Sequence, residues 1–361
     1  MITTTQVIDA LRNVDDPDLH KDLVTLNMVK DVAVDGLNVA FTVVLTTPAC
    51  PMKDMIQRAC ENAIIHYVNK DAIVNIKMTA NVTAQANKSL LPNVKNIIAV
   101  ASGKGGVGKS TVAANLAVAL AGTGASVGLL DADVYGPSQH IMFDVAHEKP
   151  MMKDIDGKSY IVPIESHGVK LLSIGFFASM TDAIVWRGPM ASKTVQQLIS
   201  DAAWGDLDYM IIDLPPGTGD IHLSIVNAIK LTGAVIVSTP QHIALADVQR
   251  GISMFALPSI NVPVLGIIEN MAYFTPAELP NNKYYLFGKD GAANMAKNLG
   301  IPLLGQIPIV QAICEGGDKG EPAVIGTDNT VTTAFLNVAK AVAQQVAIVN
   351  ANKNAIAEAE V

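Results

Sequence analysis

Apolar positions in the first 85 residues follow both helical and strand periods. The segment TTTQVIDALRNV predicts a helix that a Thr can cap. Residues 29–46 alternate apolar and polar positions around Asp35-Gly36, which predicts two strands joined by a turn. Residues 51–68 carry apolar side chains at helical spacing, and residues 73–82 read as a further strand. We therefore expect a small α+β domain over residues 1–85.

The pattern changes after a polar, Pro-containing segment at residues 86–96, which we interpret as a linker. From Ile97 onward, short apolar runs such as IIAVA, YMIIDL and AVIVST alternate with helix-like segments. Continuous apolar strands separated by helices are typical of a parallel sheet that is covered on both faces. We expect one α/β domain over residues 97–350 and a C-terminal tail over 351–361.

The composition is that of a globular protein. Of 361 residues, 50% are hydrophobic and 16% are charged, and the net charge of −8 disfavours broad binding to nucleic acid or anionic membrane. We find no signal-peptide pattern and no uncharged apolar run of the roughly 20 residues that a membrane helix needs. Three cysteines do not suggest a disulfide framework, so a cytoplasmic location is expected.

The most specific motif is GKGGVGKST at residues 103–111, between a predicted strand and a predicted helix. It matches the phosphate-loop pattern of P-loop NTPases, in which glycines let backbone N–H groups converge on phosphate oxygens at a helix N-terminus. Lys109 is expected to reach the β- and γ-phosphates of ATP, and Ser110 to bind Mg²⁺. The expected nucleotide-binding residues are Gly103, Lys104, Gly105, Gly106, Val107, Gly108, Lys109, Ser110, Thr111 and Asn270.

The lysine directly after the first glycine, Lys104, resembles the deviant phosphate loop of dimeric ATPases that include the nitrogenase iron protein and the partition ATPases. The resemblance implies that Lys104 reaches the nucleotide of a partner subunit, where a cation stabilises charge on the transferring phosphoryl group. A solvated loop lysine is the alternative reading.

Four further polar residues lie at or just after the ends of predicted strands, where α/β sheets bind ligands. The class resemblance implies that Asp133 orients the attacking water, that Asp131 lies near the metal, and that Asp213 holds Mg²⁺. It also implies that Asn270 pairs with adenine. Alternatively, Asp131 caps the next turn, and Asp213 and Asn270 are turn residues.

Four stretches, SGKGGVGKST, DADVYGPS, WRGPM and DYMIIDLPPGTGD, together resemble the Mrp/ApbC-type iron–sulfur cluster carrier ATPases. The resemblance runs from about Ile97 to about Pro322. The first domain, with DPDLHKDLVTLNMV and TTPACPMKDMI, resembles the small domain of iron–sulfur assembly factors. These resemblances imply a slow ATPase that assembles or transfers Fe–S clusters to apoproteins. Arg187 in WRGPM is expected near the subunit interface or a switch.

In that family the loop after the ENM segment normally carries a Cys-x-x-Cys pair, so that two subunits hold one 4Fe–4S cluster with four thiolates. This chain has AYFTPAELPNNKYYLFG there and no such pair. Cys50 is the remaining candidate, because a thiol at a helix N-terminus has a lowered pKa. A half-buried structural thiol is the alternative, and Cys60 and Cys314 are expected to be structural.

We therefore expect a cytoplasmic homodimer that binds Mg·ATP and carries Fe–S clusters to apo iron–sulfur proteins, with other assembly factors as partners. Lys104, Lys109 and Asp133 are the expected catalytic residues. Two other functions stay open. One is an adaptor or scaffold that holds no cluster itself, which the missing cysteine pair favours. The other is a partition- or positioning-type switch ATPase, which the acidic net charge disfavours.

Overall fold

The structure is a computed structural model, and it describes residues 2–82, 90–177, 188–217, 219, 222–223, 225–226, 229–276, 278–279, 281–327 and 329–359. The chain divides into two compact units, one of residues 1–83 and 343–361 and one of residues 84–342. Each unit has its own buried apolar core.

The first unit is the α+β domain that the apolar pattern predicts. Thr3 caps the first helix in a capping box with Gln6. A three-stranded sheet has the order β3-β4-β5, with β3 and β4 antiparallel and β4 and β5 parallel. Its elements are α1 (Thr4–Leu11), β1 (Asp15–Asp16), β2 (Lys21–Asp22), β3 (Val29–Asp35), β4 (Asn38–Leu45), α2 (Lys53–Tyr67) and β5 (Ile73–Ala80).

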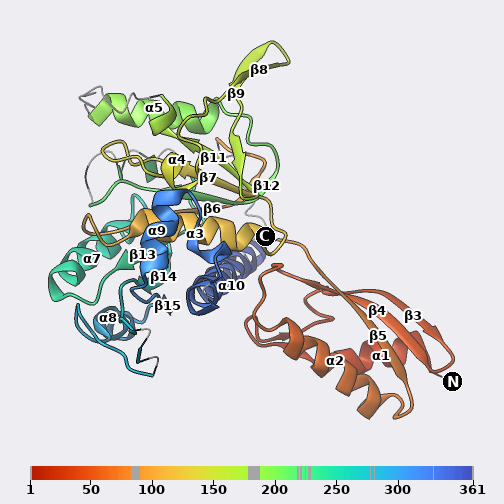
Figure 1. Ribbon diagram of the computed structural model, residues 1–361. Coiled ribbons are helices and arrows are strands. Elements are labelled where there is room, and N and C mark those ends of the chain that lie inside the picture. The colour runs from red at the N-terminus through yellow and green to blue at the C-terminus, as the bar shows by residue number, and fades with distance from the viewer. Residues whose placement is uncertain are drawn as a thin grey trace. The chain divides into compact units, whose positions relative to one another are not determined.

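The second unit is built on an eight-stranded sheet of order β10-β11-β7-β12-β6-β13-β14-β15 (Figure 1). All neighbouring pairs are parallel except β10 and β11. The sheet strands are β6 (Val94–Ala101), β7 (Val127–Asp131), β10 (Ile164–Ser166), β11 (Val169–Ser173), β12 (Leu207–Asp213), β13 (Gly233–Ser238), β14 (Val264–Glu269) and β15 (Leu303–Gln306). A separate hairpin pairs β8 (Met152–Ile155) with β9 (Lys158–Ile161).

Helices cover both faces of this sheet, which confirms the predicted α/β architecture. One apolar cluster joins strand residues such as Ile97 and Ile212 to side chains of α5, α7 and α8. The helix α3 packs on the other face against β6, β7 and β12. The helical segments of this unit are α3 (Lys109–Ala121), α4 (Gln139–Met142), η1 (Ile174–Phe176), α5 (Gly188–Ser200), α7 (His242–Phe255), α8 (Gly291–Leu299), α9 (Gln311–Lys319), η2 (Ala323–Ile325) and the start of α10 (Asn329–Ala359).

Two element boundaries differ from the sequence-based expectation. The strand β6 begins at Val94, inside the segment that we interpreted as a linker, and α10 continues through Ala359 where we expected a tail. Among the described residues, no helix is long and apolar enough to cross a membrane. The parallel strands β6, β7, β12 and β14 end at the same edge of the sheet, and the predicted polar residues lie at or just after those ends.

Candidate functional site

The phosphate loop connects β6 to α3, as the motif requires. Gly108 stands directly before α3 with φ +80°, a left-handed conformation that glycine adopts without steric cost. A Cβ atom on Gly108 would lie 2.2 Å from Nδ2 of Asn270. A Cβ on Gly103 would lie 2.4 Å from the backbone of Asp247 in α7. These two glycines are therefore needed for close packing, whereas Gly105 and Gly106 are exposed with no neighbour at the Cβ position.

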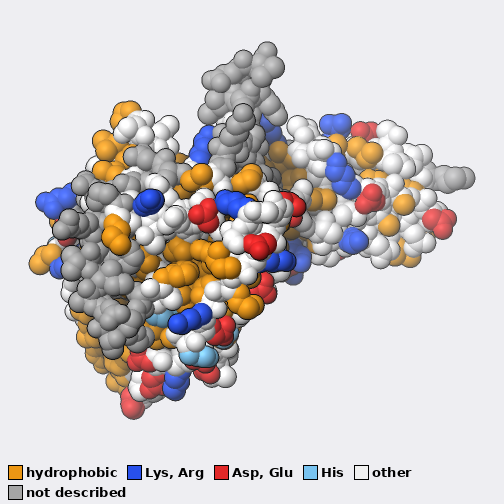
Figure 2. All heavy atoms as spheres, turned by 90° about the horizontal axis from the view of Figure 1, so that it is seen from above, with side chains coloured by type: hydrophobic (Ala, Val, Ile, Leu, Met, Phe, Trp, Pro, Cys, Tyr) orange, Lys and Arg blue, Asp and Glu red, His pale blue; other side chains and the backbone are white. Residues whose placement is uncertain are grey.

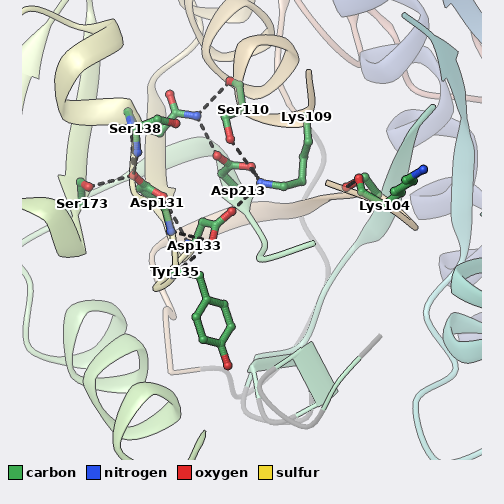
Figure 3. Close-up of polar contacts among 12 residues, drawn as sticks. Lys104, Lys109, Ser110, Asp131, Asp133, Tyr135, Ser138, Ser173 and Asp213 are labelled. Atoms are coloured by element: carbon green, nitrogen blue, oxygen red, sulfur yellow. Dashed lines mark hydrogen bonds and ion pairs between the residues drawn. The ribbon is translucent and has the colours of Figure 1, made fainter. Parts of the chain in front are cut away.

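Lys109 is the centre of a buried charge cluster (Figure 3). Its side chain is 6% exposed and forms an ion pair with Asp213 at the end of β12. Its Nζ also lies 3.5 Å from Oδ2 of Asp133 and donates a hydrogen bond of 3.3 Å to Oγ of Ser110. Burial alone would lower the pKa of Lys109, but the carboxylates of Asp213, Asp133 and Asp131 outweigh it and raise that pKa. The ammonium group is therefore charged at neutral pH.

Asp133 lies in the segment between β7 and α4. Its Oδ1 accepts hydrogen bonds from the backbone N–H groups of Tyr135 and Gly136, each at 3.3 Å. Its Oδ2 faces Lys109. The side chain is therefore oriented by its own loop, with one oxygen directed to the cluster.

Asp131 contacts a different set of groups from Asp133, although only one residue separates them. Its Oδ2 accepts hydrogen bonds from the backbone of Ser138 (3.0 Å) and Gln139 (3.1 Å) and from Oγ of Ser173 (2.8 Å). Burial, followed by repulsion from Asp213, raises the pKa of Asp131. These contacts are those of the turn-capping alternative, and the expected position of Asp131 near the metal stays a prediction.

Lys104 is exposed and points away from the Lys109 cluster in Figure 3. Its carbonyl oxygen accepts a hydrogen bond of 3.0 Å from Oγ of Ser102, which fixes the loop backbone and leaves the side chain extended. The structure thus separates the two lysines of the motif: Lys109 is buried within the chain, and Lys104 is directed outward.

Asn270 follows β14 and is buried against the phosphate loop. Its Nδ2 donates a hydrogen bond of 2.9 Å to the carbonyl oxygen of Val107. A cavity of about 650 Å³ opens beside it, between the start of α3 and the segment that leads into α9. Its apolar lining includes Met271, Phe287 and Ile309, and Thr111 reaches it from α3. This is a suitable site for a flat apolar group next to the phosphate loop.

The loop at residues 271–288, where the family resemblance places a cysteine pair, is closed by backbone pairing. Phe274 and Tyr284 exchange two hydrogen bonds of 2.8 Å, and Nζ of Lys283 lies 3.9 Å from the ring centre of Tyr273. Across the described part of the chain, no group of three or more His, Cys, Asp or Glu side chains is arranged to hold a metal ion. Arg187 lies outside the described residues.

The expected lowering of the Cys50 pKa is wrong. The helix α2 begins at Lys53, so Cys50 precedes it by three residues. Burial, together with the nearby charges of Asp16 and Asp18, raises the pKa of the half-buried thiol, although the N–H groups of Met52 and Lys53 oppose the shift. Cys60 is buried as expected, with its pKa raised to about 12, whereas Cys314 is exposed and borders the cavity beside Asn270.

Comparison with known proteins assigns the family. Residues 93–343 match the NUBPL iron-transfer P-loop NTPase family, and residues 4–85 match the iron–sulfur cluster assembly protein family. The chain belongs to the iron–sulfur cluster carrier family. It is 45% identical to an iron–sulfur cluster carrier protein of Synechocystis sp. over 96% of this chain and 98% of that protein. It is 42% identical to the chloroplastic Fe–S cluster assembly factor HCF101 of Arabidopsis thaliana over 94% of this chain and 64% of that one.

Solved structures agree with this family. A nucleotide-binding protein of Archaeoglobus fulgidus, in complex with ADP, superposes with a TM-score of 0.57 at 38% identity over 66% of this chain and 91% of that one. The cell division ATPase MinD of Pyrococcus furiosus shares the fold, with a TM-score of 0.50 at 24% identity over 68% of this chain and 97% of that one. The chain is therefore a P-loop NTPase, and MinD shares its fold.

Sequence reasoning missed Gln139 and Ser173, which contribute side chains to the cluster. Gln139 donates hydrogen bonds to Asp213 and to the carbonyl of Ser110, and Ser173 donates to Asp131. Gln139 directly follows the DADVYGPS stretch, which is the one signal that could have drawn attention to it. Ser173 ends β11 and carries no local signal.

Proposed function

We propose that this protein is a homodimeric, ATP-hydrolysing iron–sulfur cluster carrier that transfers clusters to apo iron–sulfur proteins with the help of other assembly factors. The observation that supports the ATPase part most directly is the buried contact of Lys109 with both Asp213 and Asp133. It brings the phosphate loop and two strand-end carboxylates into one cluster, the arrangement that phosphoryl transfer requires.

The donor set of this cluster fits a magnesium ion. Ser110 supplies a hydroxyl oxygen and Asp213 a carboxylate oxygen, which are the hard ligands that Mg²⁺ prefers. Bound together with ATP, the ion would offset negative charge on the β- and γ-phosphates. We expect Lys109 to turn from Asp213 toward the phosphates, because its three N–H groups already face Asp213, Asp133 and Ser110, and contacts with phosphate oxygens must replace some of these.

The remaining residues take roles that their positions support. Asp133 presents one carboxylate oxygen to the cluster and is the proposed group that orients the attacking water. Lys104 extends outward, as a residue that contacts the nucleotide of a second subunit must do. Asn270 borders the cavity of about 650 Å³, which we assign to the adenine base. Hydrolysis then depends on the dimer, because one of its cations comes from the partner.

The cluster is cargo, and thiolates are its usual ligands. The chain has three cysteines, and Cys60 is buried in the core. Cys50 remains the proposed cluster ligand, but its raised pKa means that iron must displace a proton from it. Two Cys50 thiolates in a dimer fall short of four, so a partner protein or a small thiol would complete the ligand set. Free thiols and a labile cluster suit a reducing compartment, which supports a cytoplasmic location.

One observation favours the second candidate, an adaptor that binds apoproteins without holding a cluster. The loop at residues 271–288 has no cysteine and is closed by pairing of Phe274 with Tyr284. The positioning-type ATPase has less support. On the face that Figure 2 displays, Lys and Arg side chains are scattered among acidic and apolar ones, and the net charge is −8. Neither feature suits a surface for nucleic acid or anionic lipid.

Anaerobic reconstitution with iron and sulfide tests this proposal. We expect wild type to gain iron and acid-labile sulfide together with a visible absorption band, and Cys50→Ser to gain much less. Cys314→Ser is the matched control, because Cys314 is the exposed cysteine of the other unit. Wild type that stays colourless but hydrolyses ATP would favour the adaptor. Equal loading of Cys50→Ser and wild type would remove Cys50 as the ligand.

A further inference from the structure

Gln139 carries a buried amide in the charge cluster around Lys109, and it has no role in the proposed function. It is the first residue of α4, directly after the segment that carries Asp131 and Asp133, and its side chain is fully buried. Its backbone N–H donates to Oδ2 of Asp131, which ties the start of α4 to the end of β7. The residue therefore moves with the 131–138 segment.

The side chain of Gln139 joins two other elements. Its Nε2 donates a hydrogen bond of 2.8 Å to Oδ2 of Asp213 on β12 and one of 2.9 Å to the carbonyl oxygen of Ser110 on α3. A carboxylate and a backbone carbonyl only accept hydrogen bonds, so the amide nitrogen must face them. One amide thus links β12 and α3 to the segment after β7, and both partners belong to the residues that we assign to magnesium.

Asp213 is held from two sides. Lys109 contacts its Oδ1, and Gln139 contacts its Oδ2. The proposed function requires Lys109 to turn toward the phosphates when ATP binds, which frees Oδ1. Gln139 is then the contact that still fixes the direction of the Asp213 carboxylate. A carboxylate that is oriented in advance loses less rotational freedom when it takes up a ligand.

The amide oxygen of Gln139 also points to a ligand at this site. Oε1 of Gln139 is buried and has no hydrogen-bond partner among the described residues. A buried acceptor without a donor is unfavourable, and such groups mark sites where a missing water or ion completes the structure. A hydrated magnesium ion brings O–H donors to this part of the molecule.

We propose that Gln139 is a positioning residue for magnesium: it orients Asp213 through Oδ2 and makes metal binding depend on the position of the 131–139 segment. This inference rests on the proposed function, since it needs nucleotide and Mg²⁺ at this site. Gln139 acts through Asp213 and Ser110 and does not itself touch the phosphates.

The test is to titrate Mg²⁺ against the binding of a fluorescent ADP analogue to the full chain. Gln139→Met keeps the length of the side chain but cannot donate a hydrogen bond. We expect the half-saturating Mg²⁺ concentration of this variant to rise about tenfold, because losing a hydrogen bond to a charged group weakens binding by about that factor. Binding of the analogue in EDTA should change less than about twofold, because the amide has no direct contact with phosphate.

A matched control is Gln306→Met. Gln306 also donates to two carboxylates, those of Glu269 and Asp290, but it ends β15 and its partners lie outside the Lys109 cluster. We expect no shift of the Mg²⁺ dependence in this variant. Gln139→Asn keeps the amide but is one methylene shorter, and it should shift the Mg²⁺ dependence of binding in the same direction as Gln139→Met. If Gln139→Met does not fold, the Gln139→Asn variant serves as the test of the proposal.

An unchanged Mg²⁺ dependence in the Gln139 variants, or an equal loss of binding in EDTA, would overturn the inference. Wild type that binds the analogue with no Mg²⁺ dependence would instead contradict the proposed function. The two failures are therefore distinguishable in the same experiment.

Discussion

Lys109 and Asp213 are 104 residues apart in the chain, yet they form an ion pair in which the lysine is 6% exposed and the aspartate is fully buried. This contact joins the phosphate loop to the end of β12. In the proposed function Lys109 also binds phosphate, so one ammonium group serves both the buried carboxylates and the nucleotide.

Lys109→Ala should lower both stability and nucleotide affinity. The substitution leaves Asp213 and Asp133 without their cation, and breaking a buried pair in this way costs about 3–5 kcal/mol. The measurement is denaturant unfolding together with binding of a fluorescent nucleotide. Lys95→Ala is the control, because its pair with Asp208 is part-exposed, and we expect a loss of about 1 kcal/mol or less. Equal losses in the two variants would contradict the account.

Gly108→Ala should weaken nucleotide binding about tenfold, because an L-residue at a left-handed position costs roughly 1–2 kcal/mol. The new Cβ would also displace the amide of Asn270, 2.2 Å away. Gly105→Ala tests the same chemical change at an open position of the loop, where we expect binding close to that of wild type. Isothermal titration of both variants with ADP compares them directly, and a stronger defect in Gly105→Ala would be inconsistent with the loop geometry.

Lys104→Ala should separate hydrolysis from binding. Because the side chain is exposed and directed away from the cluster, we expect the affinity for ATP to fall less than about fivefold. Turnover should fall about 100-fold or more, since a cation at the transferring phosphoryl group acts in the transition state. Steady-state ATPase kinetics give both quantities. If the affinity for ATP fell and turnover stayed unchanged, Lys104 would be a ground-state contact of the nucleotide and would have no role in the transition state.

His222 should make the protein less stable in mild acid. Burial, aided by the nearby charge of Lys109, lowers its pKa from 6.5 to about 4. The folded protein therefore favours the neutral imidazole. The contribution of His222 to the free energy of unfolding is fully present above pH 6.5 and is lost as the pH falls toward 4. Between pH 7.5 and 5.0, wild type should lose about 2 kcal/mol more than His222→Leu, by urea unfolding.

The matched control for this prediction is His147→Gln, because His147 is exposed in the same unit and should follow wild type. Comparison with wild type is necessary because the raised pKa of Asp131 changes stability in the opposite direction over part of this range. Identical pH dependence of wild type and His222→Leu would show that this imidazole titrates normally.

The features that sequence reasoning predicted well are those whose determinants are close in the chain. The apolar period around Asp35-Gly36, the cap at Thr3 and the strand–loop–helix of the phosphate loop are each contained within about 20 residues. Asp133 and Asp213 were found because they follow buried strands, and parallel strands bring their ends to one edge.

The features that sequence reasoning missed or misjudged depend on contacts between residues that are far apart in the chain. Gln139 matters because α3 and β12 meet its amide, and nothing in its neighbourhood along the chain reports that. The Cys50 pKa was misjudged because a local rule about helix ends ignored burial and the carboxylates of Asp16 and Asp18. Ser173, which was also missed, donates to Asp131 from a position 42 residues further along the chain.

In the proposed function, ATP chemistry at Lys109 is used to move an iron–sulfur cluster. The direct measurement is anaerobic transfer of iron and sulfide from the reconstituted protein to an apo-ferredoxin, with and without Mg·ATP, for wild type and Lys104→Ala. The account predicts transfer that ATP accelerates in wild type and fails to accelerate in the variant. A wild-type protein that hydrolyses ATP but delivers no cluster, or delivers it equally with and without nucleotide, would contradict it.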